Sequence, residues 1–177
     1  MISISLKRMP YTADQILRKL EERCILINHY AEAFISHPHF SSGQPEEMTV
    51  TIASLKELGL EKGATLDALF QHIQETPFKP CPPDTGFFLR LAWPDQPQSQ
   101  NSVLTGTHNS PDQAVTVLSE MLETDDAFPK GLYLRKVDGN LWLRGYVCDS
   151  AYCFPGDALF ALKKTKRNDN EKEKNDH

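Results

Sequence analysis

The chain has 177 residues and a net charge of −5, with 40% hydrophobic and 24% charged residues, which is typical of a folded globular protein. A chain of this length buries a core without help from disulfides or metal. No run approaches the roughly 18 apolar residues of a membrane span, and the N-terminus lacks the pattern of a secretory signal. We therefore expect a cytoplasmic protein with reduced cysteines, no cofactor and no membrane partner.

After a short strand or arm at 1–10, residues 13–35 predict one long helix with Thr12 as its N-cap. Apolar side chains recur along it at alternating steps of three and four, a period of 3.5. This seam consists of Leu17, Leu20, Cys24, Ile27, Ala31 and Phe34. We expect it to pack against its own domain, with Cys24 as a small core residue. The alternatives are a partner docked on the helix, or a homodimer through Leu17, Leu20, Ile27 and Phe34.

Residues 36–48 form a loop by composition, and His37 and His39 stand in it as H-x-H. Imidazoles at this spacing can bind metal, but no Cys, Asp or Glu stands at a supporting spacing, so we predict no metal site. Two short helices follow, at about 52–58 and 65–76. Their outline is that of a DNA-reading helix-turn-helix, yet the exposed side of the second helix has no Lys or Arg to meet phosphate.

A proline-rich segment at 77–85, PFKPCPPDT, marks the predicted junction between a helical N-terminal part, 1–76, and a sheet-forming part, 77–162. Residues 86–93 alternate in side-chain direction and predict a strand. Residues 111–123 are ambiguous, since a capping-box pattern favours a helix and a β-branched run favours a strand.

The most informative stretch is 131–147, GLYLRKVDGNLWLRGYV, which predicts two strands joined by Asp138 and Gly139. Asp-Gly between alternating apolar runs is the strongest short-range hairpin signal, because a type I′ turn needs positive φ at both central residues. Side chains alternate along a strand, so one face carries core leucines: Leu132, Leu134, Leu141 and Leu143. The other face carries Tyr133, Arg135, Trp142, Arg144 and Tyr146.

That aromatic/Arg face has two interpretations. The arginines can simply stack on neighbouring rings, which is worth about 0.5–1 kcal/mol per pair at exposed sites. Alternatively the face is a recognition surface, because Trp, Tyr and Arg are the usual anchors of protein interfaces. Its five residues are therefore the candidate binding residues.

A last strand is predicted at 157–162. Residues 163–177, KKTKRNDNEKEKNDH, have no apolar side chain to bury and predict a disordered tail. The tail holds six Lys/Arg and four Asp/Glu, which leaves 13 basic and 20 acidic residues, a net charge of −7, in the rest of the chain. An acidic body argues against nucleic acid as a partner, because phosphate neutralisation supplies most of such affinity.

Three segments, KELGLEKGATLDALF, CPPDTGFFLRLAW and FPKGLYLRKVDGNLWLRGYVCD, resemble a group of small uncharacterised bacterial proteins, some of which carry the label helicase. The resemblance covers about residues 54–162, and the hairpin segment is its most specific part. In those relatives the segment matching 115–122 looks like a strand, so the resemblance implies a strand here. No activity accompanies the group, and it implies no catalytic residues.

The helicase label fails on its chemistry. A helicase needs the phosphate-binding pattern GxxxxGK[ST] and an acidic partner for magnesium. The nearest glycine pair, Gly59 and Gly63, is followed by Ala64 and Thr65 and has the wrong spacing. The chain is also far shorter than two motor domains, so we reject an ATP-driven motor.

These patterns predict an α+β fold in which N-terminal helices pack on a C-terminal, mostly antiparallel sheet. The leading functional prediction is a non-enzymatic protein-binding or regulatory module that uses the aromatic/Arg face, with the N-terminal helix as a further surface. A small hydrolase-like or thiol-dependent enzyme is the alternative, with Cys148 and Cys153 beside Asp149 as candidate thiols. A third hypothesis, single-stranded nucleic-acid binding, would stack bases on the hairpin aromatics.

Overall fold

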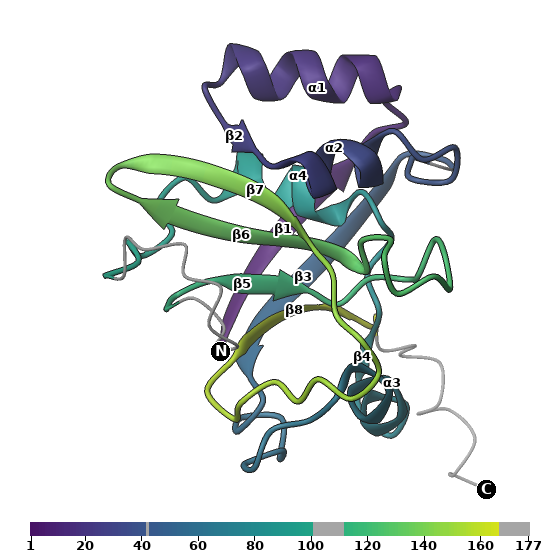
Figure 1. Cartoon of the computed structure of the whole chain (residues 1–177), viewed down its shortest axis with the longest axis vertical. Coiled ribbons are helices and arrows are strands. Elements are labelled where there is room, and N and C mark those ends of the chain that lie inside the picture. The colour runs from purple at the N-terminus through teal and green to yellow at the C-terminus, as the bar shows by residue number, and fades with distance from the viewer. Residues whose placement is uncertain (42, 101–111, 167–177) are drawn as a thin grey trace, which may run out of the picture.

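In a computed structural model that describes residues 1–41, 43–100 and 112–166, these residues form an α+β fold with four helices and one curled, mixed sheet of eight strands (Figure 1). The strands are β1 (Ile2–Arg8), β2 (Leu26–Ile27), β3 (Glu46–Ser54), β4 (Phe78–Lys79), β5 (Val115–Val117), β6 (Gly131–Val137), β7 (Asn140–Tyr146) and β8 (Leu159–Lys164). The helices are α1 (Ala13–Glu22), α2 (His29–Ile35), α3 (Leu66–Ile73) and α4 (Thr85–Ala92).

The sheet joins strands from both ends of the chain. Its order is β1-β3-β8-β5-β6-β7-β2, and β4 pairs with the end of β8. Neighbours are antiparallel except for the pairs β5–β8 and β2–β7, which are parallel. The α+β class is therefore correct, but the predicted arrangement is wrong, because helices alternate with strands along the chain and β1 and β3 share one sheet with β8.

The predicted hairpin is confirmed residue by residue. β6 and β7 pair in the register that places Val137 opposite Asn140 and Tyr133 opposite Arg144. Asp138 and Gly139 have φ values of 50° and 79°, the positive values that a type I′ turn requires. The local turn chemistry therefore determines this part of the sheet.

The predicted long helix at 13–35 is wrong, because the chain breaks into α1, β2 and α2. Cys24, with a φ of 54°, turns the chain after α1 and is exposed, so it is no core residue. Asn28 then caps α2 by accepting from the Ala31 amide. Both helices bury their share of the apolar seam against the same sheet, which explains why one period runs through the break.

The helix predicted at 52–58 is also wrong, since residues 52–54 lie in β3 and the residues from Leu55 onward form turns. The signal for a strand was present, because buried Met48, Val50 and Ile52 alternate with the more polar Thr49 and Thr51. The next helix is confirmed as α3, shorter than the predicted 65–76, and Thr65 caps it by accepting from the Ala68 amide.

The strand predicted at 86–93 is the helix α4. All residues from Thr85 to Arg90 are buried, and a short segment that is buried all round shows no helical periodicity in its sequence. A Cβ built on Gly86 would stand 3.0 Å from the Leu132 Cβ, so glycine lets α4 pack closely on β6. The ambiguous segment contains the strand β5 at Val115–Val117, which is shorter than the strand at 115–122 that the resemblance implied.

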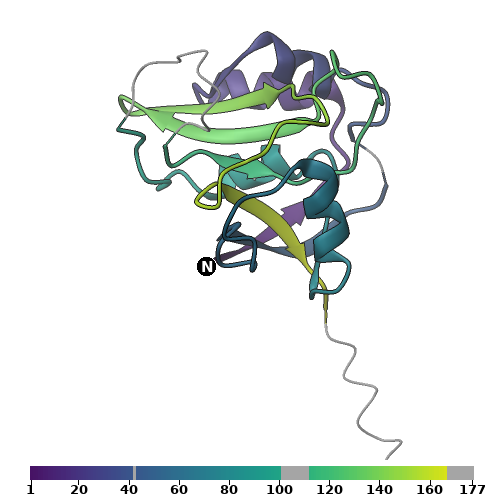
Figure 2. The same ribbon diagram turned by 60° about the horizontal axis from the view of Figure 1, so that its bottom comes forward.

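Two hydrophobic clusters cover the two faces of the sheet. One packs α1, α2 and α4 against β1, β3 and β5–β7, and the other packs α3 against β8 and the segment around Phe154. Figure 2 shows α3 beside the end of β8, away from α1 and α2. Because Ala161 enters the first cluster while Phe160 and Leu162 enter the second, β8 is buried on both faces.

The last strand extends further than the predicted 157–162, because Lys163 and Lys164 belong to β8 and not to the tail. Residues 167–177 of the predicted tail lie outside the described residues. In the part of the chain that the structure describes, no helix has both the length and the apolar character that a bilayer crossing demands.

Candidate functional site

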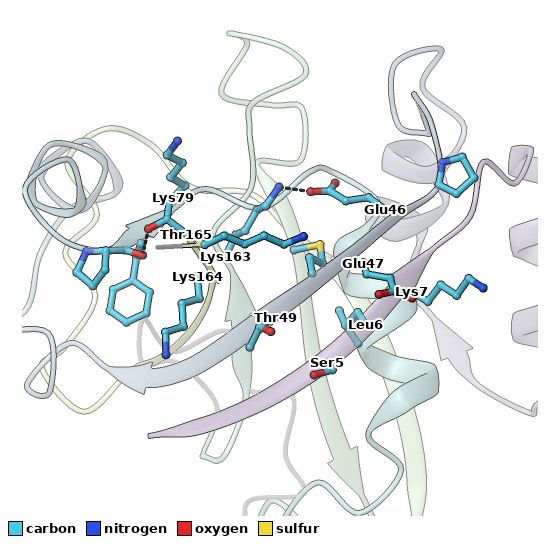
Figure 3. A pocket seen from close by; sticks show the side chains of 15 residues that line it. Ser5, Leu6, Lys7, Glu46, Glu47, Thr49, Lys79, Lys163, Lys164 and Thr165 are labelled. Atoms are coloured by element: carbon cyan, nitrogen blue, oxygen red, sulfur yellow. Dashed lines mark hydrogen bonds and ion pairs between the residues drawn. The ribbon is translucent and has the colours of Figure 1, made fainter. Parts of the chain in front are cut away.

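A groove of about 1570 Å³ lies where the ends of β1, β3, β4 and β8 meet (Figure 3). Its lining comprises Ser5, Leu6, Lys7, residues 45–49, residues 77–79 and residues 163–166. The strand register gathers these distant segments, because Lys7 stands opposite Glu47 and Lys79 stands opposite Lys163. We call this feature the lysine groove.

The lysine groove is positively charged. Its lining has five lysines and two glutamates, a net charge of +3 in a chain whose overall charge is −5. Four of the lysines are exposed, and within the described residues none of these four forms an ion pair: Lys7, Lys79, Lys164 and Lys166. In Figure 3 the fifth, Lys163, points toward Glu46, which accepts its hydrogen bond.

A chain of ion pairs fixes one wall of the groove. Arg8 donates from Nε to the Asp84 Oδ1 at 2.8 Å and from Nη1 to the Glu46 Oε2 at 2.7 Å. Glu46 also pairs with Lys163, so two cations share this one carboxylate. The Glu46 charge is therefore committed and does not neutralise the exposed lysines.

The ionisation of this network follows from burial and pairing. The hydrogen bond from Lys163 lowers the pKa of Glu46, against a smaller opposing effect of burial, and Arg8 lowers it further. Burial raises the pKa of Asp84, and the Arg8 guanidinium offsets only part of that effect. Burial alone would lower the pKa of Arg8, but its bonds and charges with Asp84 and Glu46 outweigh burial and raise the pKa.

The cysteines with shifted pKa values do not support a thiolate nucleophile. Cys81 is fully buried, and burial raises the pKa of its thiol to about 12. Burial also raises the pKa of Cys148, which is the opposite of the low pKa that a reactive thiol needs. The four cysteines are free thiols, with Cys24 and Cys153 exposed.

Two of the five predicted binding residues are covered by other parts of the chain, Arg135 almost completely and Tyr146 partly. Arg135 is only 1% exposed, and its Nε and Nη2 donate to the Ser99 Oγ at 3.2 and 3.0 Å. The Tyr146 ring meets the Phe154 ring edge to face at a centroid distance of 6.5 Å, and burial raises the pKa of its hydroxyl. The aromatic/Arg face is thus partly covered by the chain itself, which the hairpin pattern could not reveal.

The other three residues form a partly exposed cluster. The Arg144 Nε donates to the Tyr133 hydroxyl at 2.8 Å, and the Arg144 guanidinium lies 4.9 Å from the centre of the Trp142 ring. This geometry agrees with the interpretation in which the arginines of this face stack on neighbouring rings. Its use as a recognition surface stays a prediction.

The residues predicted for a homodimer lie mostly inside the fold. Leu20 is 1% exposed and Phe34 is fully buried, while Leu17 and Ile27 are partly buried against the same cluster. The homodimer stays a prediction, but Leu20 and Phe34 contact the chain's own core.

The H-x-H histidines lie near an acidic side chain. The His37 Nε2 lies 2.8 Å from the Glu123 Oε1, and the His37 Nδ1 accepts from the His39 amide. Across the described ranges no group of three His, Cys, Asp or Glu side chains is placed to hold a metal ion.

Sequence reasoning missed the lysine groove. Its residues come from four separate segments, and Lys163, Lys164 and Lys166 were attributed to the tail. A usable signal was the pair of lysines directly after the apolar run of β8, which places one lysine on each face of the sheet.

No protein-family model, curated protein or solved structure matches this chain. The resemblance given by its segments stays an expectation, and a proposal about function therefore relies on the chemistry of the site.

Proposed function

We propose that this chain is a protein-binding module whose lysine groove binds an acidic, extended segment of a partner protein. The observation that carries the proposal is the set of four exposed lysines around one groove, none of which has an ion-pair partner within the described residues. Complementary charge accelerates encounter and selects the partner, although each exposed pair contributes little affinity.

The lining favours carboxylates over a nucleic-acid strand. Proteins that bind single strands combine basic side chains with several aromatic platforms, and among the described residues that line the groove only Phe78 is aromatic. The acidic remainder of the chain also repels a long phosphate backbone. A short acidic peptide meets the groove without extending over that remainder.

The aromatic/Arg face contributes less to this proposal. Tyr133, Trp142 and Arg144 offer a small surface whose polar groups already contact one another. We keep it as a second surface for the same kind of partner.

The test reverses two charges of the groove. In the double variant Lys79→Glu/Lys164→Glu, we expect a labelled poly-glutamate peptide to bind at least about tenfold more weakly, because attraction becomes repulsion. Fluorescence anisotropy at low ionic strength measures the affinity, and binding to the unchanged protein should weaken as salt is added. Both side chains are exposed, so the thermal midpoint should stay the same.

The matched control makes the same charge change elsewhere, with Lys56→Glu/Lys62→Glu, two exposed lysines outside the groove. This variant should keep most of the affinity. An equal loss of affinity in both double variants would show that binding depends only on the net charge of the protein, and it would contradict the proposal. Tighter binding of a short oligo-thymidine than of poly-glutamate would favour the nucleic-acid hypothesis instead.

A further inference from the structure

The outer edge of β1 is unpaired. β1 ends the sheet at one side and pairs only with β3. Within the described residues, no backbone hydrogen bond joins Ile2–Arg8 to a residue other than those of β3. A seven-residue edge strand with free N–H and C=O groups is a template for another strand, and this one contains no proline or bulge that would block pairing.

A second groove, of about 390 Å³, follows this free edge. It lies between β1 and the helices α1 and α4, and it shares Ser5, Leu6 and Lys7 with the lysine groove. α4 gives it an apolar wall that includes Phe88 and Leu91. β1 therefore separates a basic groove on one side from a partly apolar groove on the other.

The second groove also has a basic rim. α1 contributes Lys19 to its lining, the C-cap of α1 contributes Arg23, and Glu22 is the acidic side chain. With Lys7, three cations border the free edge against one carboxylate. A second copy of the chain would bring the same cations to this edge, whereas an acidic partner would neutralise them.

We propose that the acidic partner segment adds to the sheet as an extra strand along the outer edge of β1; this inference rests on the proposed function. Successive side chains of such a strand point to opposite faces. Those on the face of Lys7 are acidic and meet that lysine, which lies at the β1 side of the lysine groove, and those on the other face are apolar and meet Phe88 and Leu91. The ligand is thus an extended peptide in which acidic and apolar residues alternate.

This mode of binding differs from simple charge attraction because main-chain hydrogen bonds supply part of the affinity and side-chain pockets supply the specificity. A strand that adds to an edge uses only every second amide, because the amides of alternate residues point to opposite sides. Blocking one set of amides should therefore be harmful, and blocking the other set should not.

The experiment uses the full chain and three labelled peptides: alternating glutamate and valine, the same peptide N-methylated on every glutamate amide, and the same peptide N-methylated on every valine amide. We expect one methylated form to bind at least about tenfold more weakly than the parent and the other to keep its affinity. Hydrogen exchange of the Ile2–Arg8 amides should slow when the parent peptide binds.

Equal binding of all three peptides would overturn strand addition while leaving the charge-based function intact. Absence of binding by both the parent peptide and poly-glutamate would overturn the proposed function as well. Light scattering that finds the free protein dimeric, with exchange of Ile2–Arg8 slowed by dimerisation, would assign the edge to a second copy and overturn the inference.

Discussion

Arg8 joins the sheet to the start of α4. It is 6% exposed, and it donates to Asp84, which is 1% exposed, and to the half-buried Glu46. Asp84 stands at the N-cap of α4 but makes no side-chain cap, because its carboxylate accepts from Arg8 instead. This buried pair fixes where the helix begins relative to β1.

Removal of Arg8 should be costly. In Arg8→Met, Asp84 keeps its burial and loses its counter-charge, and we expect the free energy of unfolding to fall by about 3 kcal/mol or more. Urea denaturation at neutral pH measures the loss.

A double variant tests whether the unpaired charge of Asp84 causes this loss of stability. Arg8→Met/Asp84→Asn should recover part of the stability lost in Arg8→Met, since no uncompensated charge remains buried. Two independent, additive losses would contradict the coupling between these side chains.

At the scale of elements, α2 begins directly against β7. The Asn28 side chain donates to the Gly145 carbonyl at 3.1 Å and accepts from the Gly145 amide at 2.8 Å, so it continues the pairing that β2 begins. A Cβ built on Gly145 would lie 2.5 Å from the Tyr30 carbonyl carbon and 2.6 Å from the Ala31 nitrogen. Only glycine permits this approach of backbone to backbone.

Gly145→Ala should therefore displace α2 and destabilise the protein by about 2 kcal/mol, within the range found for overpacked sites. Gly139→Ala is the comparison, because its added methyl group meets nothing within 4 Å and only the positive φ, near 79°, opposes it. Thermal denaturation followed by circular dichroism should show the larger loss for Gly145→Ala, and the reverse order would contradict the packing of α2 on β7.

The elements show what local sequence can predict. The hairpin followed from Asp138 and Gly139, because their turn chemistry is decided within four residues. The break at Cys24 did not, because a positive φ at a cysteine has no sequence signature, and the seam continues through it. The sequence of α4 predicts a strand and not a helix, because the burial of Thr85–Arg90 depends on β1, β6 and β7, which sit elsewhere in the chain.

For the candidate site, too, local sequence predicts some features and tertiary contacts determine the others. Alternation along the hairpin placed Arg135 and Tyr146 on the correct face of β6 and β7. Alternation could not show that Ser99 and Phe154 would cover them, because those contacts come from segments with no pattern of their own. The lysine groove exists only after β1, β3, β4 and β8 are paired, so tertiary structure alone creates it.

For the molecule as a whole, the Glu46 carboxylate, which Arg8 and Lys163 share, makes the free energy of unfolding depend on pH. The pKa of Glu46 lies below its ordinary value of about 4.3 in the folded state. Its contribution to stability is therefore complete above that value and is lost as the pH falls through it toward the lower folded-state pKa.

Glu46→Gln should lower stability near neutral pH and flatten the decline in stability as the pH falls through and below the ordinary pKa of a glutamate. Urea unfolding at a series of pH values measures both effects. Glu47→Gln is the control, because Glu47 forms no ion pair among the residues described, and its decline should match that of the unchanged protein. A decline in Glu46→Gln as steep as in the unchanged protein would contradict the assigned network.

β8 lies between β3 and β5, although it follows both of them, and β6 and β7, in the chain. During synthesis on the ribosome, the pair β1–β3 and the group β5–β6–β7 emerge first as two partial sheets, each with an open apolar flank. They join only when the segment up to Lys164 has left the exit tunnel. The nascent chain therefore exposes aggregation-prone edges until the β8 segment emerges, and a chaperone would have the most exposed surface to bind just before that point.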